Sequence, residues 1–307
     1  MSRFIAGRLV QTAITLLLIS ALVFGLVRLT GNPVDMMLPI EATPEMRTEM
    51  AHQLGIDRPL YEQYALFMGD LFGGDLGNSI RARRPVTELM MQRLPNSLLL
   101  VGVSMAISLA IAFPLGVLAA TRRNSLWDAM ARGTALFGQS IPTFWAGIVL
   151  IYVFGILLGW LPAGGSGGPS YVVLPALTLG LFGFMLAGVV RLLRGSMIEV
   201  LDSEFVKFAR IKGVSERAVV WKHALKNAMI PVVTFVGFYF GILISGTVVV
   251  ETVFAWPGIG RLAYEAVQWR DYPVIQGIVL LVSTITLLTN LAVDLLYAWL
   301  DPRIRYG

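Results

Sequence analysis

Side chains that can form ion pairs and bind a partner concentrate at residues 191–226, the one long run of mixed charge between long apolar segments. Its charged residues are Arg191, Arg194, Glu199, Asp202, Glu204, Lys207, Arg210, Lys212, Glu216, Arg217, Lys222 and Lys226. Charges at this density are too costly to bury in lipid, so the stretch is expected to lie in water. The chemistry that it offers is contact with another surface.

Two short helices hinged at a glycine are predicted to position these groups. Asp202 or Ser203 caps the first helix, which runs through Arg210, and Gly213 follows its end. Ser215 caps the second helix.

One face of the first helix is apolar. Phe205, Phe208 and Ala209 share this face, while Lys207 and Arg210 lie on other sides. Such a face suits a protein partner, but it also suits an amphipathic connector that lies on the lipid surface.

Groups typical of catalysis or ion-coupled transport are missing from the sequence. It contains no cysteine, and His52 and His223 fall on opposite sides of the predicted membrane, which argues against a metal site. The loop G-x-x-x-x-G-K-[ST], which cradles phosphates, is also missing, so any ATP hydrolysis belongs to another polypeptide. The apolar segments contain no Asp, Glu, Lys, Arg or His, which argues against proton coupling. A passive channel and a sodium-coupled carrier that uses carbonyl ligands remain open.

Composition predicts an all-α polytopic membrane protein. The chain has 307 residues, of which 56% are hydrophobic and 14% are charged. The net charge of +5 does not indicate nucleic-acid binding, because the basic residues follow the membrane topology instead of forming one patch with interleaved aromatic side chains.

Six transmembrane helices are predicted from apolar segments of sufficient length. They are Leu9–Val27, Ser97–Ala120, Thr134–Leu158, Val172–Val190, Ala228–Val250 and Val274–Val293. The first has an apolar core that is long for a cleaved signal peptide. Lys and Arg in the shorter loops lie mostly on the side of the termini, whereas the short outer loops contain only Arg261 and Arg270. Both termini and the 191–226 stretch are therefore expected to be cytoplasmic.

The outer segment 29–96 is predicted to contain its own helices. Pro44 begins one that Gly55 ends, Pro59 opens a second, and Pro85 opens a third short one. The second has an apolar face made of Leu60, Tyr61, Tyr64, Phe67, Met68 and Leu71. These helices either cap the membrane domain or lie on lipid. The predicted division is 1–96, with the first span and this segment; 97–299, a five-helix core with the cytoplasmic loop 191–227; and 300–307, a cytoplasmic tail.

Several small residues shape the spans. Pro114, Pro142 and Pro175 are predicted to kink or interrupt helices. Gly237 and Gly241 form a small-xxx-small face suited to close helix approach.

The two remaining outer loops differ in composition. Residues 161–171 are rich in Gly, Pro, Ser and Ala, which predicts a flexible turn. Residues 251–273 contain a candidate outer gate formed by Glu251, Phe254, Trp256, Pro257 and Gly258. The alternative is that Trp256 and Trp269 are anchors at the membrane interface.

Two motifs in the charged stretch, 204–217 (EFVKFARIKGVSER) and 222–231 (KHALKNAMIP), resemble the cytoplasmic coupling loop of ABC importer permeases of the dipeptide, oligopeptide and nickel group. Five further segments resemble other signatures of that family: residues 28–33, 54–63, 251–261, 270–274 and 301–306. The resemblance covers almost the whole chain. It implies the type I ABC importer permease fold in a bacterial inner membrane.

The resemblance also implies partners. They are a sister permease in a heterodimer, two cytoplasmic ATPase subunits or domains that bind ATP and Mg²⁺, an extracytoplasmic substrate-binding protein, and membrane lipid. The chain itself is expected to be no enzyme and to carry no cofactor. The expected cargo is a di- or oligopeptide, with glutathione or a nickel chelate as alternatives. A purely structural assembly subunit is a further alternative.

Coupling to the ATPase is expected, by resemblance, at Glu204, Phe205, Phe208, Ala209, Lys212 and Gly213. In the broader importer pattern, Glu-Ala-Ala-x-x-x-Gly, Ala209 and Gly213 match the last Ala and the Gly. Lys207 and Phe208 replace the Glu and the first Ala, and Lys226 stands where a Pro is expected.

Overall fold

A computed structural model describes residues 2–30, 34, 43–53, 55 and 57–300. The signature residues 31–33, 54, 56 and 301–306 lie outside this range. Within it, the chain forms helices, and the one β-type pairing is an isolated bridge between Asn78 and Pro85. The helices are α1 (Ser2–Thr30), α3 (Pro44–Gln53), α4 (Leu60–Phe72), α5 (Val86–Thr121), α6 (Leu126–Ser140), α7 (Thr143–Leu150), η1 (Ile151–Leu157), α8 (Pro169–Leu181), α9 (Phe184–Leu201), α10 (Glu204–Ile211), α11 (Glu216–Ala218), η2 (Val219–Ala224), α12 (Leu225–Val253), α13 (Ile259–Gln268) and α14 (Tyr272–Leu300).

Four helices are long and apolar enough to cross a membrane: α1, α5, the continuous helix Glu216–Val253, and α14. Two further spans are bent pairs, α6 with α7 and η1 at 94°, and α8 with α9 at 51°. Counting each pair as one span agrees with the six that were predicted. The first bend falls before Pro142, whose ring disfavours helical backbone at the preceding Ile141, and the second falls at Phe182 and Gly183.

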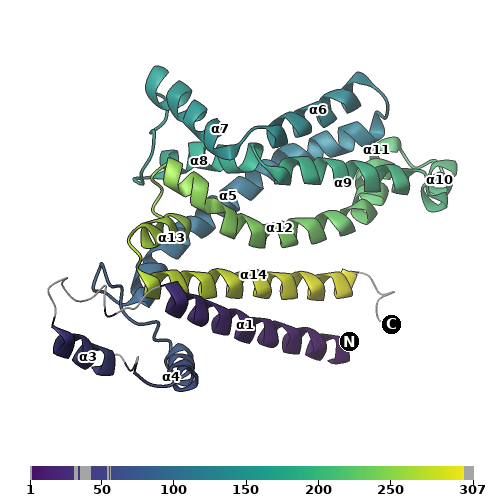
Figure 1. Ribbon diagram of the computed structural model, residues 1–307. Coiled ribbons are helices and arrows are strands. Elements are labelled where there is room, and N and C mark those ends of the chain that lie inside the picture. The colour runs from purple at the N-terminus through teal and green to yellow at the C-terminus, as the bar shows by residue number, and fades with distance from the viewer. Residues whose placement is uncertain (1, 31–33, 35–42, 54, 56, 301–307) are drawn as a thin grey trace.

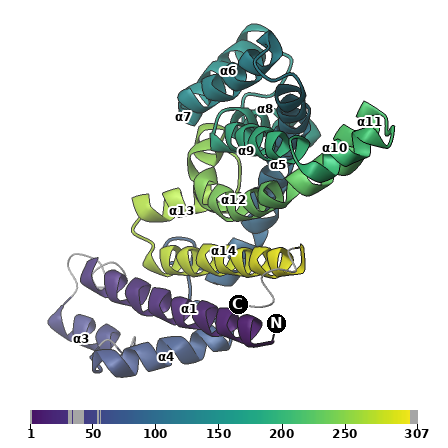
Figure 2. The same ribbon diagram turned by 90° about the vertical axis from the view of Figure 1, so that its right-hand side faces the viewer.

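The arrangement of the helix ends agrees with the predicted topology. The start of α1, the end of α14, and α10 lie at one end of the bundle, whereas α3 and α13 lie at the other (Figure 1). Figure 2 looks onto the first end and shows α10 and α11 projecting sideways from the bundle. The 191–226 stretch, the start of α1 and the end of α14 are thus on one side.

Helix α9 is central to the core and packs against α5, α6 and α12. Its Val189, Leu193 and Met197 are fully buried. Close approach depends on glycine, because a Cβ at Gly116 of α5 would lie 2.9 Å from the Leu193 side chain. The predicted close face on α12 is confirmed in the same way: a Cβ at Gly237 would lie 2.3 Å from Val293 of α14.

The outer segment packs beside the first span. Tyr64 Oη and Ser20 Oγ share a hydrogen bond of 2.8 Å, and Tyr64 and Phe67 contact the ring of Phe24. Helix α4 therefore packs along the side of α1, about two turns before the outer end of α1. The two predicted helices at Pro44 and Pro59 are confirmed. The prediction of a third, short helix was wrong, because the helix that follows Pro85 continues without a break into the second span.

Candidate functional site

Helix α10 begins where it was predicted to begin. Ser203 occupies the N-cap with extended backbone, and its carbonyl accepts from Lys207 N–H. Its hydroxyl does not cap α10 but donates to the carbonyl of Val200, and Asp202 ends the preceding helix α9. Glu204 lies in the first turn, where a negative charge is favourable, and accepts from Lys207 Nζ at 2.8 Å. This hydrogen bond raises the pKa of Lys207.

The end of α10 is a glycine cap, as predicted. Gly213 has φ +78°, the left-handed region that favours glycine. Gly213 N–H donates to the Arg210 carbonyl at 2.9 Å, and Val214 N–H donates to the Ala209 carbonyl at 3.2 Å. These two bonds are a Schellman motif, which satisfies carbonyls that the helix end would leave unpaired.

The sides of α10 have different environments. Val206 is fully buried in the core cluster that contains Val219. Phe205, Phe208 and Ile211 face away from it, with 48%, 57% and 81% of their surfaces exposed. Ala209, predicted to share the apolar face, is half-buried. The outward face is therefore made of two phenylalanines and an isoleucine, and Lys212 Nζ lies 4.7 Å from the centre of the Phe208 ring.

An ion pair holds the base of α10. Arg210 donates through Nε and Nη2 to the two carboxylate oxygens of Glu216, at 2.7 and 3.3 Å. Its Nη1 lies 3.4 Å from the Leu201 carbonyl at the end of α9. The guanidinium group therefore joins α9, α10 and α11. A cavity of about 760 Å³ adjoins this junction, between the ends of α5 and α9 and residues 216–221.

The second helix of the stretch was predicted to be short, and this was wrong. The helix that starts after Ser215 continues through Pro231 to Val253. In a membrane helix, neighbouring helices and local adjustments of the backbone can satisfy the carbonyl that a proline leaves without a donor. Here the π-helical segment η2 (Val219–Ala224) precedes Pro231 in the same continuous helix. One hinge point, at Gly213, therefore separates α10 from the fifth span.

The candidate gate residues lie together in a closed turn between α12 and α13. Glu251 is fully buried, and its carboxylate accepts from Ser97 Oγ at 2.6 Å and from Arg261 N–H at 2.9 Å. Ser97 Oγ in turn accepts from Ile259 N–H at 2.8 Å. Two N–H groups in the first turn of α13 are thus satisfied by side chains from α5 and α12, in place of an N-cap side chain at Gly258.

The other members of this turn are also packed. A Cβ at Gly258 would lie 2.3 Å from the Glu251 carboxylate, so the carboxylate occupies the space that glycine leaves. Trp256 is buried and donates from Nε1 to the Asn96 carbonyl at 3.1 Å, so its prediction as an interfacial anchor was wrong. Asn96 also donates to the Pro257 carbonyl at 2.9 Å. A gating role for this turn stays a prediction.

The outer loop 161–171 is tied to the same turn. Gly165 N–H donates to the Phe254 carbonyl at 2.7 Å, and a Cβ at Gly164 would lie 2.5 Å from that oxygen. Phe254 is buried, and a Cβ at Gly147 would lie 3.0 Å from its ring. The loop was predicted to be a flexible turn, but these contacts hold it against Phe254.

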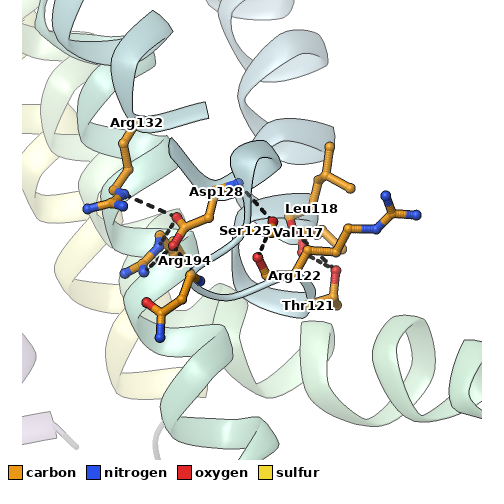
Figure 3. Close-up of polar contacts among 9 residues, drawn as sticks. Val117, Leu118, Thr121, Arg122, Ser125, Asp128, Arg132 and Arg194 are labelled. Atoms are coloured by element: carbon orange, nitrogen blue, oxygen red, sulfur yellow. Dashed lines mark hydrogen bonds and ion pairs between the residues drawn. The ribbon is translucent and has the colours of Figure 1, made fainter. Parts of the chain in front are cut away.

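Sequence reasoning missed two buried acids. Asp271 is buried and accepts from Ser79 Oγ, Ile80 N–H and Arg81 N–H, which fixes the outer loop before α5. Asp128 is fully buried at the start of α6 and pairs with Arg194 of α9 (Figure 3). The signal in the sequence was an isolated acid among Arg122, Arg123 and Arg132, although its partner could not be read from that pattern.

Two family models match the chain. The model of the binding-protein-dependent transport system inner membrane component matches residues 112–306, and the model of its N-terminal part matches residues 1–101. The chain belongs to this family of ABC importer permeases. It is a multi-pass subunit of the inner membrane and has no catalytic role of its own. Membership implies an ATPase and a binding protein as partners, and it replaces the passive channel and the sodium-coupled carrier considered above.

Relatives and solved structures agree with this assignment. The glutathione transport system permease protein GsiC of Escherichia coli (strain K12) is 42% identical over 307 residues, which is 100% of both chains. The protein of the same name from Shigella dysenteriae serotype 1 matches equally well. An inward-facing MetNI methionine ABC transporter aligns with TM-score 0.58 at 18% identity, covering 69% of this chain and 96% of that one. A crystal structure of an amino acid ABC transporter with histidines aligns with TM-score 0.51 at 16% identity, covering 71% and 94%. These two structures support the fold.

Proposed function

We propose that this chain forms half of the pathway of an importer whose cargo is glutathione. The observation that carries the proposal is the 42% identity, over the full length of both chains, to permeases named for glutathione transport. Glutathione is a tripeptide, so this cargo lies within the chemical class of short peptides that the motifs indicate. The relatives favour it over an ordinary di- or oligopeptide and over a nickel chelate.

Uptake into proteoliposomes tests the cargo. The assembled transporter, with its binding protein outside and ATP on the ATPase side, is expected to take up labelled glutathione, and unlabelled glutathione is expected to compete better than a dipeptide or a nickel chelate. Stronger competition by a dipeptide would return the cargo to ordinary peptides. Uptake that continues without hydrolysable ATP would contradict an ATP-driven importer.

We infer that α10 is the surface on which the ATPase acts. The exposed Phe205, Phe208 and Ile211 form an apolar face on α10, which lies at the same end of the bundle as the start of α1 and the end of α14. Val206, on the opposite side of α10, is buried in the core. Tight binding surfaces commonly centre on such aromatic side chains. The glycine cap and the Arg210–Glu216 pair hold this face at a defined angle to α9 and α11. Glu204, Lys207 and Lys212 then form its polar rim.

The assembly that follows contains two permeases. We propose a heterodimer with a sister permease, two ATPase subunits or domains that bind ATP and Mg²⁺ below it, and a binding protein on the outer side. ATP-driven closure of the ATPases would move α10 and open the pathway toward the binding protein. In this assembly the closed turn at Glu251, Phe254, Trp256, Pro257 and Gly258 forms part of the outer gate.

A further inference from the structure

A buried ion pair joins α6 to α9 close to the coupling helix. The Asp128 carboxylate has no exposed surface, and Arg194 grips both of its oxygens, with Nε 2.7 Å from Oδ1 and Nη2 2.8 Å from Oδ2 (Figure 3). Arg132 adds a contact of 3.2 Å from the next turn of α6, and Asn124 N–H donates at 3.1 Å. A paired carboxylate of this kind is costly to break, because removing one partner leaves the other charge poorly compensated.

Only part of this cluster serves the local start of α6. Ser125 is the N-cap of α6, and Asp128 reaches back to the backbone at Asn124, as an acid in the first turn of a helix commonly does. That function would be complete without Arg194, which lies 66 residues away in sequence. The bidentate bond therefore serves a connection between two helices.

The connection leads directly to α10. Arg194 lies two turns before the end of α9 at Leu201, and one short turn at Asp202 and Ser203 leads from there into α10. Arg210 of α10 lies back against the Leu201 carbonyl. A displacement of α10 thus reaches α9 first, and the ion pair is a buried polar connection from α9 to α6.

The two spans that contain α6 and α9 also break next to each other. Helix α6 ends at Ser140 before its 94° bend, and α9 begins at Phe184 after a 51° bend. The two bends are neighbours in space, because a Cβ at Gly138 would lie 2.5 Å from the carbonyl oxygen of Leu181. Helices α6 and α9 are therefore joined by the ion pair, and the breaks in their two spans lie next to each other.

We propose that Asp128 and Arg194 are positioning residues that make α6 follow α9 and α10 when the ATPase acts. Residues 126–140 and 184–211 then move as one arm about the two breaks. This rests on the proposed function of α10. Without the ion pair, α9 would move and α6 would lag, so ATP hydrolysis would continue while transport falls.

Distances between spin labels test the arm without disturbing it. Because the chain contains no cysteine, single pairs can be introduced at exposed positions: Met130 with Glu199 within the arm, and Met130 with Tyr152 across the first break. In the assembled transporter, trapping with ATP and vanadate is expected to shift the Met130–Tyr152 distance by several ångström and to leave the Met130–Glu199 distance unchanged. An equal shift in both pairs, or in neither, overturns the arm.

Uptake per ATP hydrolysed tests the ion pair. Asp128→Asn and Arg194→Gln are expected to lower this ratio by about tenfold, a typical size for coupling between sites, and to broaden the Met130–Glu199 distance. Arg132→Gln is the matched control, because it removes a contact to the same carboxylate from within α6, and its ratio is expected to stay within about twofold of wild type. An unchanged ratio in both test variants overturns the proposal. The proposed function of α10 is tested separately. If the ATPase never contacts Phe208, the coupling function is refuted whatever the spin-label distances show.

Discussion

The glycine cap of α10 yields the sharpest prediction. Gly213 has φ +78°, and a Cβ built there would meet no atom within 4 Å, so a substitution strains the backbone without creating a steric clash. The left-handed region costs an ordinary residue about 1–2 kcal/mol, a β-branched one more, and asparagine less. Since about 1.4 kcal/mol corresponds to tenfold, Gly213→Val should reduce the population of the intact cap by about tenfold or more.

A graded series of variants tests this reasoning. Gly213→Asn, Gly213→Ala and Gly213→Val are expected to insert normally and to lower uptake per ATP hydrolysed in that order, because the angle of α10 becomes less defined. Gly195→Ala is the matched control, a glycine of α9 with free space around it and no positive φ. The reasoning is refuted if the valine variant couples as well as wild type, or if asparagine uncouples as strongly as valine.

Three further changes follow from contacts in the structure. Gly258→Ala should displace the Glu251 carboxylate from the first turn of α13 and lower uptake without lowering binding of the ATPase, which co-purification measures. Gly237→Ala should force α12 away from α14 and cost about 1–3 kcal/mol, whereas Gly246→Ala on the same helix, with nothing within 4 Å, should be neutral. Thermal unfolding in detergent compares these two, and equal midpoints would contradict the packing argument. Phe208→Asp should weaken ATPase co-purification by at least about tenfold and leave membrane insertion unchanged, and normal co-purification would contradict the docking face.

Helix α10 could be predicted because its limits depend on neighbouring residues. Ser203 and Gly213 mark its ends through local backbone conformation, and the spacing of Phe205 and Phe208 places both on one face. The number of spans could be predicted for a similar reason, since apolar length is a local property. The family signatures then predicted the ATPase as the partner of this helix, and this stays a prediction.

The bends in two spans could not be predicted from hydropathy. Apolar residues continue through both breaks, so the segments read as uninterrupted helices, although Pro142 did mark the first of them. Pro175 was predicted to kink or interrupt the other span, but it lies inside α8, and the bend falls later, at Gly183. Its neighbour Leu181 lies against Gly138 of another helix, and this contact depends on the tertiary fold.

The partners of the buried acids could not be predicted for the same reason. Asp128 accepts a hydrogen bond from Arg194, 66 residues away in sequence, and Glu251 accepts one from Ser97, 154 residues away. In the sequence, Arg194 counted as one more basic residue on the cytoplasmic side. Glu251 was predicted as a gate residue, and this stays a prediction; the hydrogen bond from Arg261 N–H to its carboxylate in the first turn of α13 could not be read from the sequence.

Photo-cross-linking in membranes tests the central claim most directly. A photoreactive residue replaces Phe208 on the outward face of α10 in one sample and Tyr61 in the other. Tyr61 is similarly exposed but lies on α4, on the opposite side of the proposed membrane topology. The account predicts that Phe208 captures the cytoplasmic ATPase and that Tyr61 does not. Capture of lipid alone at Phe208, or capture of the ATPase at Tyr61, would contradict it.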